Sequence, residues 1–533
     1  MTELEILPMK ASFDVGDAIV LEVRGGAGDG EVVVWRLGDE VLRAAHSRSP
    51  QLALGWLPEG SYGIEYTVGS STVRTAVEVT AAGSSRLRYG FVVDYAPGRS
   101  LVGVGDLVRR LHLTDIQFYD WAYRHADLLG GGDNYTDALD QPITLQTVRE
   151  LIAAVQAAGA RALGYAAVYA VGPTEWPTWK HRAILTAEGE PYALGDFLNL
   201  VDPASADWLA SFTAQLAQAT TELGFDGFHL DQYGYPKSAI RADGASVDVA
   251  TSFRALIESV RATMPSGQLV FNNVNDFPTW ATASTNQDAV YIEVWEPNTT
   301  LGSLAAIVSR ARGVAAGKPI VIAAYQHVYD SAPAAAADLA TSFTMATLFS
   351  HGATHLLAGE VDRILVDPYY VRNHVVESST ADLLKRWYDF LVEHDELLMD
   401  PAIVEVTASY AGDYNDDCDV SFASAATTGF VKAGGVWRRI TIAGDRLVVH
   451  LINLTAQDDD LWDAARNEPG TAGVGTLRFR RVGNGVPRVR FANPDGTPRL
   501  IDVPVEFDGN YATAKLPAFA IWQVVVIDLE PAK

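Results

Sequence analysis

The sequence contains a single cysteine, Cys418, among 533 residues. One thiol cannot form an intramolecular disulfide, and it cannot build the cysteine–histidine cluster of a structural zinc site. We expect Cys418 to be a small buried apolar residue. Acidic neighbours such as Asp416 and Asp417 could bind calcium, but a solvated loop is the simpler explanation. The sequence therefore predicts neither a metal nor a cofactor.

Long apolar runs and an excess of positive charge are also missing. No run of about 18 apolar residues occurs, so we expect no membrane span. With 40 basic and 66 acidic residues the net charge is −26, which repels phosphate backbones and anionic lipids. The first residues show neither the basic nor the apolar region of a signal peptide. We expect a cytoplasmic monomer that binds no nucleic acid and no membrane, although a secreted protein already trimmed of its signal peptide would look the same.

The chain is long enough for two to four domains. Residues 1–85 consist of short strand-like runs between Gly, Asp and Ser clusters, which predicts an immunoglobulin-like β-sandwich. The AAGSS segment, 81–85, is expected to join this domain to the next. Residues 399–533 return to the same rhythm and predict a second β-sandwich. The chain is thus expected to be multidomain, with its catalytic part in the middle.

Residues 86–398 alternate apolar strands with helical segments, which is typical of βαβ units and a parallel sheet. Eight strands within about 300 residues fit a central (β/α)8 TIM barrel. The gap at 275–288 is short for a helix. A doubly wound sheet is less consistent, because no Gly-rich phosphate loop follows the first strand. The eight expected strands are 88–95, 115–121, 161–168, 227–231, 268–274, 289–295, 319–325 and 354–359.

Acidic and aromatic residues occur at the ends of several expected strands, where barrel enzymes carry their active sites. Alternation along each strand decides which side chains point inward. Two inward carboxylates among aromatic rings suit glycoside hydrolysis, in which one attacks or activates water and the other protonates the leaving oxygen. The expected inward residues are Gln117, Tyr119 and Trp121, with Asp120 at the rim, then Gly227, His229 and Asp231, then Tyr291, Glu293 and Trp295.

Each of these residues also has a plainer explanation. An Asp that ends a strand, such as Asp231 or Asp94, commonly starts a turn, and Trp295 could simply pack. Glu293 is harder to explain in this way, because a carboxylate inside an apolar strand is costly unless it is paired or functional. His229 is expected to be a core histidine that supports Asp231 by a hydrogen bond.

Seven segments, in order along almost the whole chain, resemble glycoside hydrolase family 66, the endo-dextranases and cycloisomaltooligosaccharide glucanotransferases. A single segment such as GFHLD also resembles the α-amylase clan. That clan places an Arg where this chain has His229, and it takes its acid from strand five, where FNNVN offers none. The seven segments are QFYDWAYRH (117–125), NLVDPASADW (199–208), GFDGFHLDQYG (224–234), FNNVN (271–275), YIEVWEP (291–297), HGATHLLAGE (351–360) and HLINLTAQDDDLW (450–462).

The resemblance implies a β-domain, a (β/α)8 barrel and a C-terminal β-domain. It implies that Asp231 is the nucleophile and Glu293 the acid/base of a retaining, endo-acting hydrolase that cleaves α-1,6-glucosidic linkages in dextran or isomaltooligosaccharides. Tyr119 and Asp120 match the family's QFYDW segment and are expected to hold the sugar at the cleavage point. The residues expected around the substrate are Tyr119, Asp120, Tyr169, His229, Trp295 and Glu360.

Two alternatives stay open. The first is a transglycosylase of the cycloisomaltooligosaccharide-forming type, which would share the covalent intermediate. Cyclising members of the family carry an inserted carbohydrate-binding module, and the longest gap here, about 169–226, is too short for one, which favours hydrolysis. The second is a glucan-binding protein without catalysis on a hydrolase fold. The presence of both Asp231 and Glu293 argues against it.

Overall fold

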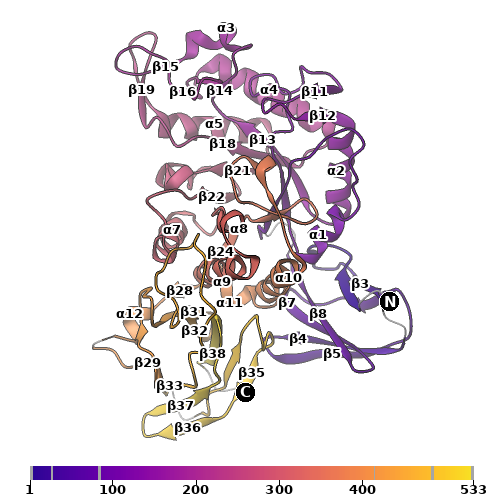
Figure 1. Ribbon diagram of the computed structural model, residues 1–533, viewed down its shortest axis with the longest axis vertical. Helices are drawn as coiled ribbons and strands as arrows, with labels where there is room; N and C mark the ends of the chain where they lie inside the picture. The colour runs from indigo at the N-terminus through magenta and orange to yellow at the C-terminus, as the bar shows by residue number, and fades with distance from the viewer. Residues whose placement is uncertain (1–3, 26–27, 82–85, 413, 482–484, 530–533) are drawn as a thin grey trace.

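The computed structural model describes residues 4–25, 28–81, 86–412, 414–481 and 485–529 (Figure 1). The protein is multidomain and mostly β, with one large curled sheet and several smaller ones. Most of the predicted joint at 81–85 lies outside the described residues. The boundaries at 85 and 398 stay predictions. Within the described residues, none of the helices is both long and apolar enough to cross a bilayer.

Two sheets form the N-terminal part. Alternating side chains from both sheets, including Ile6, Leu21, Val34 and Tyr62, bury one common apolar cluster. One sheet has the order β1-β3-β6 and the other β2-β8-β7-β4-β5. The strands are β1 (Glu5–Pro8), β2 (Phe13–Asp14), β3 (Ile19–Arg24), β4 (Gly30–Arg36), β5 (Asp39–His46), β6 (Gln51–Gly55), β7 (Gly60–Val68) and β8 (Ser71–Thr80).

The large sheet contains a counterpart of each of the eight predicted strands. Its order is β24-β23-β22-β21-β18-β13-β10-β9-β25-β26-β27, and the pairs from β24 through to β9 are all parallel. The strands are β9 (Tyr89–Val92), β10 (Asp115–Phe118), β13 (Arg161–Ala167), β18 (Gly227–Asp231), β21 (Gln268–Asn272), β22 (Ala289–Glu293), β23 (Ile320–Ala323), β24 (Ala353–His355), β25 (Ala358–Gly359), β26 (Arg363–Ile364) and β27 (His374–Val375).

One segment, residues 353–359, contacts both β23 and β9. Its first part, β24, pairs with β23, whereas Gly359 of β25 pairs in parallel with Phe91 of β9. The two backbones approach so closely that a Cβ at Gly359 would lie 2.2 Å from Cδ1 of Phe91. Only glycine avoids this overlap. The sheet therefore curls until its eighth predicted strand lies beside its first.

The curled sheet buries a different apolar cluster on each face. Residues such as Phe91, Leu163 and Val270 share one cluster inside the curl, while an adjacent residue on each of these strands, Val92, Ala162 or Phe271, packs in the outer cluster with the helices. This alternation follows from the period of two along a strand. The helices around the sheet are α1 (Val104–Arg110), α2 (Leu145–Ala157), α4 (Ala206–Leu223), α5 (Val249–Thr263), α6 (Thr279–Thr282), α7 (Leu301–Val314), α8 (Val328–Ser331), α9 (Ala334–His351), α10 (Ser378–Glu393) and α11 (Asp395–Leu398).

The helical segments expected between the strands are present, and the longer ones include α2, α4 and α7. The short gap at 275–288 holds only η2 (Val274–Asp276) and the four-residue α6. Small sheets absent from the sequence prediction lie beyond the strand ends, at the top of Figure 1. Their elements are β11 (Asn134–Thr136), β12 (Pro142–Thr144), β14 (Ala170–Val171), α3 (Trp176–Trp179), η1 (Lys180–Arg182), β15 (Ile184–Leu185), β16 (Ala193–Leu194), β17 (Leu198–Leu200), β19 (Ser238–Arg241) and β20 (Ser246–Asp248).

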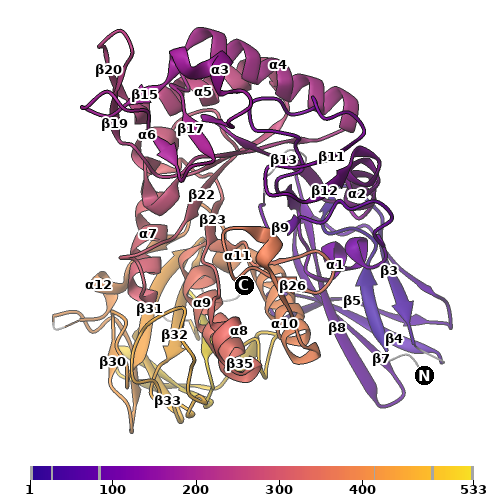
Figure 2. The ribbon, with the colours of Figure 1, turned by 45° about the horizontal axis from the view of Figure 1, so that its top comes forward.

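The C-terminal part consists of a seven-stranded and a four-stranded sheet around a common apolar cluster. Cys418 is buried in this cluster, as predicted. In Figure 2 these sheets lie beside the N-terminal sheets, away from the small sheets at the strand ends. The elements are β28 (Val404–Glu405), α12 (Thr407–Tyr410), β29 (Cys418–Phe422), β30 (Thr427–Thr428), β31 (Val436–Ala443), β32 (Arg446–Asn453), β33 (Gly475–Arg480), β34 (Val489–Ala492), β35 (Ile501–Val503), β36 (Val505–Asp508), β37 (Tyr511–Leu516) and β38 (Trp522–Asp528).

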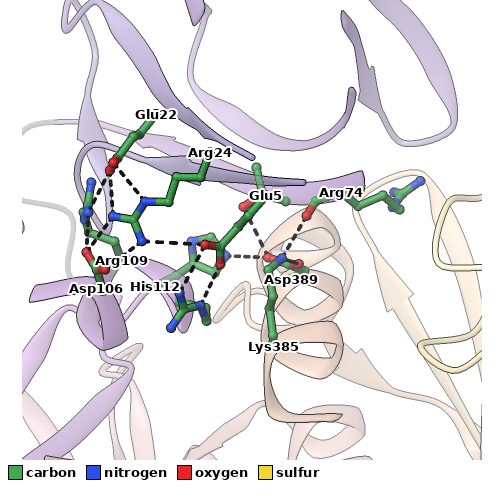
Figure 3. Close-up of polar contacts among 11 residues, drawn as sticks. Glu5, Glu22, Arg24, Arg74, Asp106, Arg109, His112, Lys385 and Asp389 are labelled. Atoms are coloured by element: carbon green, nitrogen blue, oxygen red, sulfur yellow. Dashed lines mark hydrogen bonds and ion pairs between the residues drawn. The ribbon is translucent and has the colours of Figure 1, made fainter. Parts of the chain in front are cut away.

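Charged side chains join the N-terminal sheets to α1 and α10 (Figure 3). Arg24 of β3 lies between Glu22 and Asp106 of α1, at 2.9 and 2.7 Å. Lys385 of α10 donates to the backbone oxygen of Arg74 on β8 at 2.8 Å, and Asp389 of the same helix accepts from the buried His112 at 2.8 Å. The partially buried Arg24 holds the pKa of Asp106 at about 2. Such a network of complementary charges fixes how the N-terminal sheets sit against the central sheet.

Candidate active site

A cavity of about 220 Å³ opens at the carboxyl ends of the parallel strands. Most of the strands of the curl, and segments that follow them, contribute to its lining. Of the eight residues expected to act on or hold the substrate, the structure brings six to this cavity: Tyr119, Asp120, His229, Asp231, Glu293 and Trp295.

Asp231 and Glu293 are joined by one side chain, Asn272. Its Nδ2 donates to Oδ1 of Asp231 at 2.7 Å and to Oε2 of Glu293 at 2.8 Å. Because both bonds share one nitrogen, Oδ1 of Asp231 and Oε2 of Glu293 lie at most about 5.5 Å apart, which agrees with the spacing of about 5–5.5 Å at which retaining glycosidases hold their carboxyl groups. The remaining oxygens accept from two tyrosines, Tyr165 at 2.7 Å for Asp231 and Tyr325 at 2.9 Å for Glu293.

The two carboxyl groups have different surroundings. Burial raises the pKa of Asp231, while hydrogen bonds from Asn272, Tyr165 and the backbone of Gln232 lower it. Burial also raises the pKa of Glu293, and the charge of Asp231 raises it further. Hydrogen bonds from Asn272, Tyr325 and Trp295 lower the pKa of Glu293 as well, so the charge of Asp231 is the cause that acts on Glu293 alone, and it favours Glu293 as the site of a proton shared by the pair. This division suits an acid and a nucleophile at one site.

Asp120 reaches the cavity because the backbone turns at that position. Its φ is 45°, in the left-handed region, and β10 has already ended at Phe118. The turn interrupts the strand alternation, so Trp121 does not share the inner face with Tyr119 as expected. Trp121 packs instead in the outer cluster and donates to the backbone oxygen of Tyr165 at 3.1 Å. Burial and the charges of Asp137 and Asp231 raise the pKa of Asp120 well above its ordinary value.

Tyrosines line much of the remaining wall. Tyr119 stacks on Tyr370 with ring centres 4.2 Å apart. Tyr370 belongs to η3 (Tyr370–Arg372), between β26 and β27. Its hydroxyl donates to Oε1 of Gln117 at 3.3 Å. Trp295 lies 5.7 Å from the ring of Tyr325. These apolar faces with hydroxyl edges suit a ligand that has both C–H and O–H surface.

Tyr169 and Glu360 lie outside the lining of this cavity. Tyr169 is fully buried and donates to the backbone oxygen of Tyr235 at 2.6 Å. Glu360 is held at the ends of β9 and β25, where its Oε1 accepts from the backbone of Val93 at 2.6 Å. His229 lines the cavity, but its Nδ1 is hydrogen-bonded to the hydroxyl of Tyr89 at 3.1 Å and not to Asp231. Burial lowers the pKa of His229 to about 3, so it is neutral.

Three contact residues of the carboxylates were missing from the expected set: Tyr165, Asn272 and Tyr325. The alternation rule could have found all three, because Tyr165 shares a face with Leu163 on β13 and Asn272 shares a face with Val270 on β21. Tyr325 follows β23 at the same parity. All three are neutral hydrogen-bond donors, and a criterion based on carboxylates at strand ends does not select them.

The C-terminal sheets contact the rim next to Glu293. Trp462, from the segment after β32, donates its Nε1–H to the backbone oxygen of Asn298 at 2.7 Å. Asn298 in turn donates to Oδ1 of Asn275 at 2.6 Å, and this oxygen also accepts from the backbone of Trp295 at 3.3 Å. Asn275 has a φ of 53°. The loops after β21 and β22 are thus tied together and to the C-terminal part.

Within the described ranges no group of three or more His, Cys, Asp and Glu side chains has the arrangement of a metal site. The cavity's own residues are instead a carboxylate pair, neutral hydrogen-bond donors and aromatic rings. Such a set can attack an acetal carbon, protonate the oxygen that departs and deprotonate the oxygen that arrives. This lining is typical of carbohydrate-active enzymes that use two carboxyl groups.

Comparisons with known proteins agree with this class. The family model of glycosyl hydrolase family 66 matches residues 62–526. A cycloisomaltooligosaccharide glucanotransferase of Niallia circulans is 23% identical over 401 residues, which covers 66% of this chain and 41% of that protein. A dextranase of Streptococcus salivarius is 25% identical over 255 residues, or 41% of this chain and 30% of that protein. The matches thus span less than half of the length of these relatives.

A solved structure shares the whole fold. The cycloisomaltooligosaccharide glucanotransferase of Paenibacillus sp., complexed with cycloisomaltoheptaose, superposes with a TM-score of 0.87 at 18% identity and covers 98% of this chain and 99% of that one. The family match extends over most of the chain. The chain belongs to glycosyl hydrolase family 66.

Proposed function

We propose that this protein is a retaining hydrolase of α-1,6-glucosidic linkages, acting within dextran or isomaltooligosaccharide chains on a (β/α)8 barrel. The observation that carries the proposal is the single Asn272 amide that contacts both carboxylates. It places Oδ1 of Asp231 and Oε2 of Glu293 at most about 5.5 Å apart, which supports the short carboxyl spacing of about 5–5.5 Å that retaining enzymes use.

The steps follow from the positions of the two acids. The carboxylate of Asp231 attacks the anomeric carbon, while protonated Glu293 gives its proton to the departing glycosidic oxygen. This breaks the glycosidic bond and forms a β-linked glucosyl ester on Asp231. Ionised Glu293 then removes a proton from water, which attacks the same carbon, releases Asp231 and leaves the α-configuration. The hydrogen bonds from Asn272 and Tyr165 favour the ionised form of Asp231 that begins and ends this cycle.

The linkage and chain type rest on the family. Dextranase and cycloisomaltooligosaccharide glucanotransferase are the names of its matched relatives. The second of these names supports one other candidate, transfer of the glucosyl group to a sugar hydroxyl in place of water. Hydrolysis and transfer share every residue described above and differ only in which acceptor reaches the ester.

A trapping experiment tests the proposal at Asp231. The chain is incubated with 5-fluoro-α-D-glucosyl fluoride, whose glucosyl ester hydrolyses slowly, and the digested protein is analysed by mass spectrometry. The proposal predicts a fluoroglucosyl adduct on Asp231, and none in the Asp231→Asn variant. Turnover of an α-1,6-glucan without any adduct, together with first products of β-configuration, would refute retention.

A further inference from the structure

A second cavity, of about 370 Å³, lies at the ends of β9 and β25. Its polar lining comes from five residues on four different segments: Asp94, Gln141, Glu360, Arg363 and Asn373. None of these residues belongs to the lining of the catalytic cavity. Two of them, Asp94 and Glu360, follow the carboxyl ends of β9 and β25, which lie at the same end of the sheet as Asp231.

The two cavities are separated by a thin wall. Leu139 and Tyr370 line the catalytic cavity, whereas Gln141 and Val371, one or two residues further along the same segments, line the second one. The side chain of Asn373 donates back to the backbone oxygen of Tyr370 at 2.7 Å. A chain that leaves the catalytic cavity over Leu139 and Tyr370 thus reaches the second cavity next.

Glu360 holds the second cavity in shape. Its Oε1 accepts from the backbone N–H of Val93 at 2.6 Å and of Asp94 at 2.9 Å, and its Oε2 pairs with Arg99 at 2.7 Å. Its φ of 57° is a strained conformation for a residue with a side chain, and such strain is concentrated at functional sites. The hydrogen bonds from Val93 and Asp94 to Glu360 fix the backbone at Asp94.

The groups that face the second cavity suit a neutral ligand with hydroxyl groups. Oδ1 of Asp94 accepts from the backbone of Ala96 at 3.0 Å, and Oδ2 has no hydrogen-bond partner in the described part of the chain. The guanidinium of Arg363 pairs with the neighbouring Asp362 at 3.4 Å, and the charge of Glu360 is neutralised by Arg99 at 2.7 Å. A sugar hydroxyl both donates and accepts, so it can pair with a carboxylate and a guanidinium at once.

We propose that the second cavity binds a further glucosyl unit of the same α-1,6-linked chain, beyond the wall formed by Leu139 and Tyr370. This inference rests on the proposed function, because its ligand is the α-1,6-linked chain on which the enzyme is proposed to act. An α-1,6 linkage has three rotatable bonds, which lets the chain bend over the wall. Asp94 and Arg363 then select for chain length, while Asp231 and Glu293 perform the reaction.

Calorimetry tests this without requiring turnover. Isomaltotriose and isomaltohexaose are titrated into the Asp231→Asn protein and into the same protein that also carries Asp94→Ala or Arg363→Ala. We expect the hexasaccharide to bind more tightly than the trisaccharide, and either added change to reduce this ratio of affinities about tenfold, as for loss of one charge-assisted hydrogen bond. Asp382→Ala, on the exposed face of α10, is the matched control and is expected to leave the ratio unchanged.

The outcomes separate the two proposals. If the hexasaccharide binds and the ratio is the same with and without Asp94, the second cavity holds no sugar and only this inference is overturned. An equal loss for both lengths would also overturn it, because it would indicate a change in the catalytic cavity. If neither sugar binds and the unaltered chain cleaves no α-1,6-glucan, the proposed function falls and this inference with it.

Discussion

Replacing Asn272 by alanine removes the amide that donates to both carboxylates of the site. Each of its hydrogen bonds lowers the pKa of its acceptor. A hydrogen bond to an ionised group contributes about 1.5–3 kcal/mol, and one pKa unit corresponds to about 1.4 kcal/mol. Water that enters the space left by the amide replaces part of this effect. We therefore expect both pKa values to rise by about one unit.

The pH profile of kcat/KM measures this change. Activity requires ionised Asp231, which sets the acid limb, and protonated Glu293, which sets the alkaline limb. In Asn272→Ala both limbs are expected to move about one unit to higher pH, with a lower maximum because the carboxylates lose their common support. Asn286→Ala, an exposed asparagine just before β22, is the control. A variant that turns over with unshifted limbs would refute the role given to Asn272.

Three further predictions concern the same site. Asp231→Asn is expected to lower kcat by about 10⁴-fold or more. Because burial raises the pKa of Asp231, its ionisation lowers the stability of the folded chain as pH rises through the raised pKa. The variant should therefore melt at a higher temperature than the unaltered chain at pH 8 but not at pH 4. Glu293→Ala is expected to cleave only substrates with good leaving groups, and added azide should restore turnover with α-glucosyl azide as product; β-azide would exclude retention. Trp462→Phe keeps an aromatic ring but loses the hydrogen bond to Asn298. About a fivefold fall in kcat/KM without a change in melting temperature is expected, since one neutral hydrogen bond contributes about 1 kcal/mol. An unchanged kcat/KM would mean that the C-terminal contact does not position Trp295.

The sequence predicts the strands of the central sheet well, because each is a short apolar run between helices with clear periodicity. It also predicts the carboxylate pair, since alternation places Asp231 and Glu293 on inner faces at strand ends. Both residues line one cavity in the structure. What alternation cannot supply is the distance between them, which depends on how the sheet curls and on Asn272.

Other features depend on backbone turns that local patterns do not reveal. The left-handed conformation of Asp120 moves Trp121 to the outer core, against the expected parity. Tyr370 reaches the cavity because the hairpin of β26 and β27, which contains it, folds back over the strand ends. Tyr169 and Glu360 were expected around the substrate, but Tyr169 is buried in the core and donates to the backbone of Tyr235, while Glu360 accepts from the backbone of Val93.

The central claim is that this chain cleaves α-1,6-glucosidic linkages with retention. The most direct test incubates the purified protein with dextran and, separately, with isomaltooligosaccharides of defined length, and follows the first products by NMR before they mutarotate. The account predicts short isomaltooligosaccharides whose new reducing ends are in the α-configuration. First products in the β-configuration would contradict retention. No product from either substrate, with a folded protein, would contradict the linkage.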